Sequence, residues 1–336
     1  MTALVAEAAI KSAVLLFLML TATAYLTFLE RRLLARFQLR LGPNRVGPLG
    51  LLQPLADGIK LLFKEDFIPA GADRLIYWLA PAISMVTALV VYAVIPFGPE
   101  VHLFGRRIPL YLADVNVGIL LVLAASSIGV YGIILGGWAV NNKYSLLGSL
   151  RSTAQLISYE LAMGLAVITA VLLAGSLSLV RIVEAQRDLW FVFRFPYGTV
   201  ALILFLTAAV AETNRAPFDL PEAEQELIAG YQTEYGGFKF AMFFIGEYLS
   251  VITMSLLAAT LFLGGWHGPP LVGGFLPPLL WLVFKALAGV FLFVWLRATL
   301  PRVRHDRLMA LGWKVLLPVG LANIVLAAVA ISLRGG

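Results

Sequence analysis

The feature of this sequence that most constrains its fold is a series of apolar blocks, each about 20 residues long, separated by polar segments. At about 1.5 Å per residue, a helix of that length crosses a hydrocarbon core of about 30 Å. Lipid offers no partner to backbone N–H and C=O groups, so each block must satisfy its own backbone as a helix. We therefore predict an all-α, polytopic integral membrane protein.

Eight spans are predicted within a single membrane domain that covers residues 1–336. They lie at about residues 10–29, 75–96, 115–139, 154–178, 197–212, 238–263, 276–297 and 314–333. The composition agrees, because only 13% of the residues are charged, against about 25% in soluble domains. The first block runs into Glu30-Arg31-Arg32 without a small-residue cleavage pattern, so we predict a retained span and not a signal peptide.

The basic residues predict the orientation of these spans. The odd-numbered connections and their edges hold 8, 2, 2 and 5 Lys or Arg residues, 17 together, whereas the even-numbered ones hold only Arg106, Arg107, Arg181, Arg187 and Arg194. By the positive-inside rule, the odd connections are cytoplasmic and both termini lie outside. The net charge of +6 thus indicates topology, and no nucleic-acid partner is expected.

Two connections are predicted to be structured. Residues 52–64 carry apolar side chains at helical spacing opposite Asp57, Lys60 and Lys64, which is typical of an amphipathic helix lying in the membrane interface. A surface helix packed on the bundle gives the same pattern. The acidic connection 212–237 interleaves carboxylates with aromatic and aliphatic residues, and Asp219 with Glu222 forms a capping box for a short helix ending near Gly230. A solvated acidic run is the alternative.

Three carboxylates lie inside predicted spans, all in the cytoplasmic half: Glu160, Glu212 and Glu247. Each charge costs about 2.5–3.5 kcal/mol on insertion scales, so such acids normally face a protein interior or a wet cavity. Together with the acidic connection below them, they suggest a proton relay, with Lys285 near the midplane as a cationic member. The alternative is that they pair with Lys or Arg and only fix helix packing.

The chain is not expected to hold a redox centre or a metal. It contains no cysteine, which excludes thiolate-ligated clusters, and its three histidines, His102, His267 and His305, lie in connecting segments. We therefore expect no haem, flavin or iron–sulfur cluster in this chain, and no catalytic residue acting alone.

Several segments resemble the H-subunit family of NADH-quinone oxidoreductase, respiratory complex I, whose mitochondrial counterpart is NADH dehydrogenase subunit 1. The matching stretches, in order, are Glu30-Arg31-Arg32, LGPNRVGPLGLLQPLADGIKLLFKED from Leu41, KYSLLGSLRSTAQLISYE from Lys143, AETNRAPFDLPEAEQELIAGYQTEY from Ala211 and RATLPRVRHDRLMALGWKVLLP from Arg297. Each motif alone is weak evidence for the family, but together they cover most of the chain and are very specific to it.

The resemblance implies a subunit of the bacterial inner membrane whose cytoplasmic connections meet the peripheral quinone-site and iron–sulfur subunits. NAD, FMN and the clusters belong to partner subunits, quinone is the substrate, and small and antiporter-like membrane subunits and lipid are further partners. The match assigns the quinone channel and its mouth to Glu30, Arg31, Arg40, Asp57, Arg215, Phe218 and Arg297. It assigns the proton path to Glu160, Glu212, Glu222, Glu224, Glu226 and Glu247.

Where some family members carry a further acid in the third span, this chain has Ser126-Ser127-Ile128-Gly129, so no carboxylate is assumed there. Without the resemblance, Arg31 and Arg297 also fit the role of topology anchors. Two other functions remain open. A homologous component of a ferredoxin-, deazaflavin- or hydrogen-dependent complex fits the same motifs. A stand-alone ion transporter fits less well, since the chain lacks inverted repeats.

The orientation can be tested by labelling, because the native chain has no cysteine. We expect a cysteine introduced near residue 145 to react with an impermeant maleimide only from the cytoplasmic side. One near residue 270 should react only from outside. The reverse pattern would refute the predicted orientation.

Overall fold

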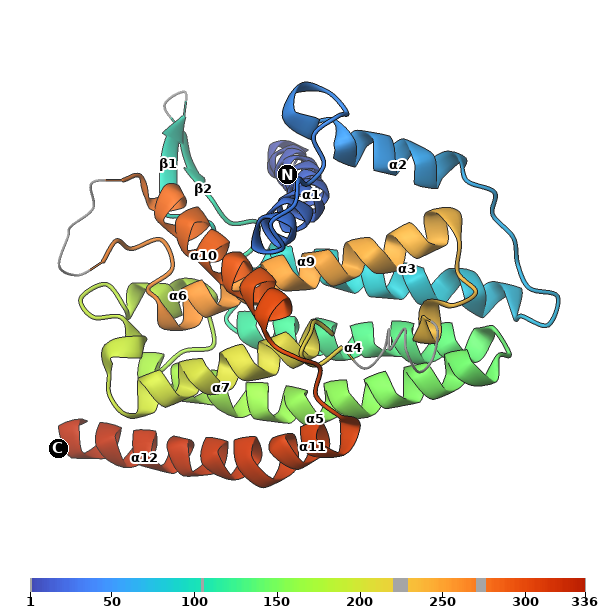
Figure 1. Cartoon of the computed structure of the whole chain (residues 1–336). Coiled ribbons are helices and arrows are strands. Elements are labelled where there is room, and N and C mark those ends of the chain that lie inside the picture. Colours follow the sequence, from blue (N-terminus) through green and yellow to red (C-terminus); the bar gives the residue numbers. More distant parts are fainter. Residues whose placement is uncertain (1, 104–105, 220–228, 270–275, 336) are drawn as a thin grey trace.

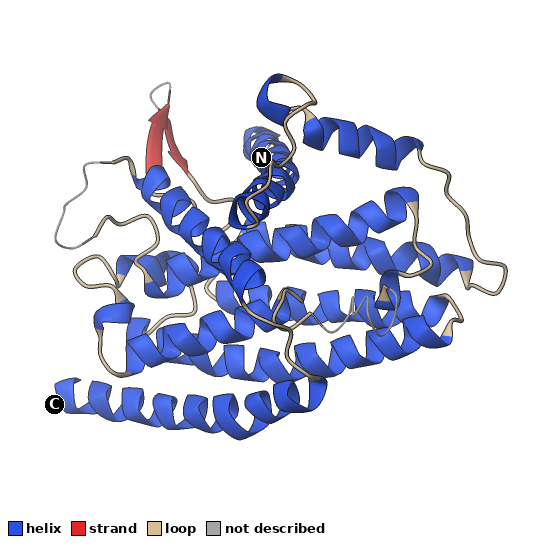
Figure 2. Ribbon diagram, viewed as in Figure 1, coloured by secondary structure: helices blue, strands red, loops and turns tan. Residues whose placement is uncertain are grey.

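The computed structural model describes residues 2–103, 106–219, 229–269 and 276–335 of the chain. Within these residues, seven helices are long and apolar enough to cross a membrane, and Tyr197–Glu212 is a shorter apolar helix. Helices make up nearly all of the regular structure in this part of the chain (Figure 2). The prediction of an all-α polytopic membrane protein is confirmed.

The helices follow the order of the apolar blocks. They are α1 (Thr2–Phe37), α2 (Gln53–Phe63), α3 (Arg74–Val90), α4 (Gly118–Ala139), α5 (Lys143–Ala174), α6 (Leu179–Glu184), α7 (Tyr197–Glu212), α9 (Gly237–Phe262), α10 (Pro278–Thr299), α11 (His305–Leu311) and α12 (Leu317–Gly335). A π-helical turn, Gly312–Leu316, joins the last two.

Some helices extend well past the predicted spans. α5 begins at Lys143, 11 residues before the predicted start at 154, so Lys143 and Arg151 are helical and do not lie in an open connection. The Asn142 side chain caps this helix by accepting a hydrogen bond from the Tyr144 backbone N–H at 3.0 Å. Helix ends are set by such caps and not by the edge of the apolar block, which is why hydropathy missed this one.

A small β-hairpin lies in the second connection, where the sequence predicted no regular structure. Its strands β1 (Glu100–Leu103) and β2 (Arg106–Pro109) pair antiparallel, with Glu100 opposite Pro109. Strands of four residues give too short a pattern for periodicity to detect.

The long helices pack as roughly parallel and antiparallel rods, and α10 crosses in front of α9 (Figure 1). α9 lies at the centre, where it contacts α1, α3, α7 and α10, while α5 packs between α4, α7 and α12. Buried hydrogen bonds tie distant helices: the Tyr92 hydroxyl donates to the Leu249 carbonyl at 2.8 Å, and Asn323 Nδ2 donates to the Tyr197 carbonyl at 3.1 Å.

α2 stands apart from the other rods and contacts α1 and α9 (Figure 1). Every residue of α2 is described, and none is buried. Its apolar side chains Leu55, Ile59, Leu62 and Phe63 are exposed. This arrangement matches the predicted helix at 52–64, and it leaves an apolar face available to lipid.

Small residues let α3 and α4 approach closely. A Cβ atom on Gly132 of α4 would lie 2.9 Å from the Ala80 carbonyl oxygen and 3.0 Å from the Ser84 backbone nitrogen. Both neighbours are backbone atoms of α3, so a side-chain rotation cannot relieve the clash and the helices would have to move apart. Gly164 of α5 is the opposite case, because a Cβ there would meet no atom within 4 Å.

We therefore expect Gly132→Ala to destabilise the protein by about 1–3 kcal/mol through overpacking. Gly164→Ala, the matched control, should be neutral or slightly stabilising, since Ala is the better helix former. The measurement is the thermal unfolding midpoint of the assembled, detergent-solubilised complex. Equal midpoints for both variants would contradict the close-packing argument.

Candidate functional site

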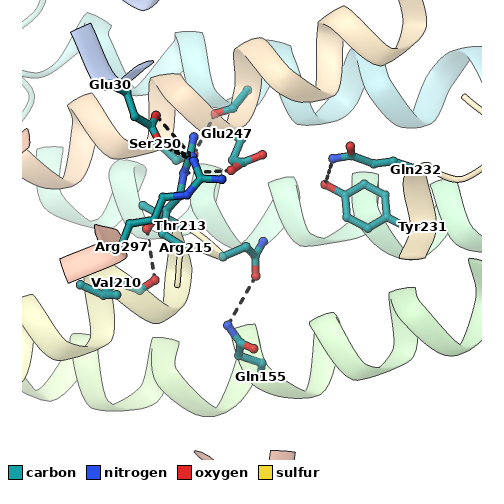
Figure 3. Close-up of polar contacts among 12 residues, drawn as sticks. Glu30, Gln155, Val210, Thr213, Arg215, Tyr231, Gln232, Glu247, Ser250 and Arg297 are labelled. Atoms are coloured by element: carbon teal, nitrogen blue, oxygen red, sulfur yellow. Dashed lines mark hydrogen bonds and ion pairs between the residues drawn. The ribbon is translucent and has the colours of Figure 1, made fainter. Parts of the chain in front are cut away.

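Four charged side chains meet in the interior where α1, α9, α10 and the segment after α7 come together (Figure 3). The Arg215 guanidinium lies between two carboxylates: its Nη1 is 3.1 Å from Glu30 Oε1 and its Nε is 3.0 Å from Glu247 Oε1. Arg297 Nη1 also donates to Glu30 Oε1. We call Glu30, Arg215, Glu247 and Arg297 the charged cluster; two positive and two negative groups balance it.

The charged cluster is mostly removed from solvent. The side chains of Glu30, Arg215 and Glu247 are 6%, 8% and 12% exposed, whereas Arg297 is 35% exposed and marks the open side. Burial alone lowers the pKa of Arg215, but the charges of Glu247 and Glu30 outweigh it and raise the pKa above its ordinary value. Arg215 is therefore a permanent cation, and it also lies 4.3 Å from the Tyr248 ring centroid.

The loop that carries Arg215 is held by α5. Gln155 Nε2 donates to the carbonyls of Ala211 and Phe218, each at 2.8 Å, which fixes both ends of the loop. The buried Phe218 ring packs on Tyr159, with 5.6 Å between centroids. These contacts turn the start of the acidic connection inward, so it is not a solvated run in its described part.

A cavity of about 90 Å³ lies beside the charged cluster, enough for a few water molecules. Its polar lining includes Ser126, Glu212, Asn214, Glu247, Ser250 and Thr253. The Glu212 Oε2 atom is buried and has no hydrogen-bond partner in the part of the chain that the structure describes. A polar cavity with an unsatisfied carboxylate oxygen is where water is expected.

Glu212 and Glu160, the two intramembrane acids outside the charged cluster, contact serine hydroxyls and not cations. Ser126 Oγ donates to Glu212 Oε1 at 2.7 Å, and Ser127 Oγ contacts Glu160 Oε1 within hydrogen-bond distance. Among the described residues, neither Glu212 nor Glu160 makes an ion pair with Lys or Arg. The sequence left open that these acids pair with Lys or Arg and only fix helix packing. That alternative fits Glu247, which pairs with Arg215, but it does not fit Glu212 and Glu160.

Next to Glu30 in the sequence, Arg31 joins α1 to α2 through a polar contact. Arg31 Nη1 lies 2.6 Å from Asp57 Oδ2, and Gln53 Nε2 donates to Asp57 Oδ1 at 2.9 Å. Arg40, assigned to the same mouth, lies past the end of α1, is exposed and donates to the Gln38 side chain at 2.7 Å. It is not brought together with the other site residues.

A second buried ion pair anchors the end of the acidic connection. Lys239 Nζ, fully buried, lies 2.7 and 2.8 Å from the two Asp66 carboxylate oxygens and 4.3 Å from the Trp78 ring centroid. The Tyr77 hydroxyl donates to the Glu234 carbonyl at 2.7 Å. The segment after α2, the start of α3 and the start of α9 are therefore tied together.

Lys285 lies away from the acids. Its Nζ donates to three backbone carbonyls, those of Leu263, Gly265 and His267, at 2.6, 2.8 and 2.6 Å, and lies 4.1 Å from the Trp190 ring centroid. All three ammonium donors are used at the end of α9, opposite the Arg297 end of α10. The structure therefore places Lys285 against carbonyls and not beside the carboxylates, and its membership of the relay stays a prediction.

Residues 220–228 lie outside the described residues, and they include Glu222, Glu224 and Glu226. The predicted capping box lies there in part, because it pairs Asp219 with Glu222. No group of three or more His, Asp or Glu side chains that could hold a metal ion occurs in the described part of the chain. Gln155 and Tyr248 were missed in the sequence analysis, although a polar residue five positions before Glu160 and an aromatic residue next to Glu247 were available signals.

The fold and the site define a class: a polytopic helical membrane protein with a buried charged cluster and a polar cavity at its centre. A family model described as NADH dehydrogenase matches residues 10–328. The chain belongs to this family, in the branch formed by the H subunits of NADH-quinone oxidoreductase.

Its relatives include the H subunits of NADH-quinone oxidoreductase from several bacteria. The Geobacter metallireducens protein is 56% identical, over 96% of each chain. A Geobacter sulfurreducens protein is 58% identical over 94% of each chain. The Thermomicrobium roseum protein is 58% identical over 93% of this chain and 92% of its own.

The charged cluster predicts the effect of removing its central cation. Arg215→Gln leaves Glu30 and Glu247 with one cation between them, so we expect a loss of about 3–5 kcal/mol, seen as a sharp drop in assembled complex and in its unfolding midpoint. Adding Glu247→Gln removes one uncompensated charge and should restore part of that loss.

The control for this experiment is Arg304→Gln. Arg304 pairs with Asp306 at 2.5 Å, but the two side chains are 79% and 56% exposed, so no measurable change in stability is expected. Wild-type assembly and melting in Arg215→Gln would contradict a structural role for the charged cluster.

Proposed function

We propose that this chain is the membrane subunit of a proton-pumping NADH:quinone oxidoreductase, forming part of the quinone cavity and coupling quinone reduction to proton translocation. One observation carries the proposal: ionisable and hydroxyl groups follow one another through the interior, from the charged cluster past the polar cavity to Glu212 and Glu160. The names of the relatives support the same enzyme.

In this proposal, the quinone channel opens between α1 and α2. The Arg31–Asp57 pair holds the two helices together, and the exposed apolar side chains of α2 offer a surface to an isoprenoid tail. Glu30, Arg215 and Arg297 then face the inner part of the channel, and Phe218 fixes the loop beside them. Arg40 remains a prediction for the outer edge of the mouth.

The proton path in this proposal starts at Glu247 and crosses the polar cavity to Glu212. Ser126 and Ser127, consecutive residues of α4, hold Glu212 and Glu160. Glu222, Glu224 and Glu226 are proposed members on the cytoplasmic side. A quinone that takes up two electrons also takes up two protons, and this changes the charge facing Arg215 and Arg297. The charged cluster converts that change into a shift of protons on the acids beyond it.

The chain catalyses no redox step alone. NAD, FMN and the iron–sulfur clusters are proposed to reside in peripheral partner subunits, and quinone, a substrate, meets this chain from the lipid. Small and antiporter-like membrane subunits receive the protons. The protein is proposed to lie in the bacterial inner membrane, with its odd-numbered connections in the cytoplasm and both termini outside.

The relay is tested by Glu212→Gln, alongside Glu160→Gln and Glu247→Gln. Gln keeps the shape of Glu but does not bind and release a proton near neutral pH, so quinone reduction and pumping per assembled complex should fall together by at least tenfold. Assembly should survive in Glu212→Gln and Glu160→Gln, and it should drop in Glu247→Gln, which leaves Arg215 paired with Glu30 alone. The measurement is quinone reduction and proton uptake in inside-out vesicles, normalised to assembled complex.

The control variant is Asp114→Asn. Asp114 accepts a hydrogen bond from Ser178 Oγ at 2.7 Å, as Glu212 does from Ser126, but it lies in the second connection, outside the proposed path. Its variant should pump normally. A purely structural role for Glu212 and Glu160 predicts instead that Gln is tolerated, because it removes a buried charge that has no cationic partner in the described residues. Near-normal pumping in all three Glu→Gln variants would end the relay proposal.

A further inference from the structure

The hydroxyl of Ser127 in α4 has two acceptors within reach. Its Oγ lies 3.0 Å from the Leu123 carbonyl oxygen, four residues earlier in the same helix, and within hydrogen-bond distance of Glu160 Oε1 on α5. A serine hydroxyl carries one hydrogen and can donate to only one of these oxygens at a time. The two contacts therefore allow two arrangements of protons, which differ in whether the Ser127 hydroxyl donates to Glu160 or accepts from it.

In the first arrangement, Glu160 is ionised and Ser127 donates to it. The Leu123 carbonyl loses nothing essential, because it also accepts the backbone hydrogen bond of the helix. In the second, the Glu160 carboxyl carries a proton and donates it in a hydrogen bond to Ser127 Oγ, while the Ser127 hydroxyl turns to the Leu123 carbonyl. The hydroxyl acts as a donor in one state and an acceptor in the other, so Glu160 keeps its hydrogen bond in both.

Two other serines of the bundle do not have this property. Ser255 in α9 donates to the Val251 carbonyl at 2.8 Å, the same four-residue spacing, and no carboxylate is among its bonded partners in the described residues. Ser126 contacts a carboxylate, Glu212, and its hydroxyl bonds to no helix carbonyl in the described part of the chain. The second acceptor at Ser127 is thus a property of its position and not of a helical serine in general.

We propose that Ser127 is a positioning residue of the proton path, whose hydroxyl turns between the Leu123 carbonyl and Glu160 as Glu160 binds and releases its proton. The inference rests on the proposed proton-path function and adds a residue to it. No proton leaves Ser127 in this step: the proton that Glu160 gains arrives from the path, and the hydroxyl only rotates. Within the described residues, Ser127 is the one side chain that donates to Glu160, so its loss would leave the ionised carboxylate without a protein donor.

The test compares Ser127→Ala with Ser127→Thr in the assembled enzyme. We expect Ser127→Ala to lower the turnover number for quinone reduction and the rate of proton uptake about tenfold, the factor expected for losing a hydrogen bond to a charged group. The KM for quinone should not change, because the quinone cavity is untouched. Ser127→Thr keeps the hydroxyl and the helix bond and should restore most of the rate. Ser255→Ala, the matched control, should behave as wild type.

A double variant separates a role in the path from a role in packing. In a Glu160→Gln background there is no carboxylate to hold, so adding Ser127→Ala should cause no further loss of turnover. Additive losses, normal turnover in Ser127→Ala, or equal loss in Ser127→Ala and Ser127→Thr would each overturn the proposal. If Glu160→Gln lowers pumping while Ser127→Ala does not, this inference fails and the proposed function stands. If Glu160→Gln itself pumps normally, the proposed relay fails.

Discussion

The placement of Arg215 between Glu30 and Glu247 is the interaction on which the centre of the molecule depends. None of these charges can be buried alone in an apolar bundle without a large loss of free energy. Since they come from α1, α9 and the segment after α7, those elements must meet at one point. Gln155 and Phe218 then hold the Arg215 loop in place, so the fold of that loop follows from the same requirement.

The buried acids of the bundle have two kinds of surroundings. Glu30 and Glu247 face guanidinium groups, which favour the charged form of a carboxylate. Glu212 and Glu160 face serine hydroxyls, which donate to a charged carboxylate and accept from a neutral carboxyl equally well. In the proposed path, Glu30 and Glu247 respond to the charge of the quinone, and Glu247, Glu212 and Glu160 exchange protons across the polar cavity.

Hydropathy located the long apolar helices because the lipid requirement acts on every residue of a crossing helix. It failed where other forces decide: the Asn142 cap starts α5 well before its apolar block, and the β1–β2 hairpin is too short to show a period. Lys285 illustrates a different limit. Its depth along α10 was readable, but three carbonyls at the end of α9 bind it, and no pattern in the sequence encodes that contact.

The sequence by itself determined the class of fold, the family and the identities of the charged residues, since apolar length and motif strings are local properties of the chain. Only the tertiary structure decided which charges neutralise one another. Glu30 and Arg215 are 185 residues apart, and Ser127 and Glu160 lie on different helices, so their contacts arise from helix packing. Packing chooses these partners because a buried charge is stable only where an opposite charge or a hydrogen-bond donor lies within about 3 Å.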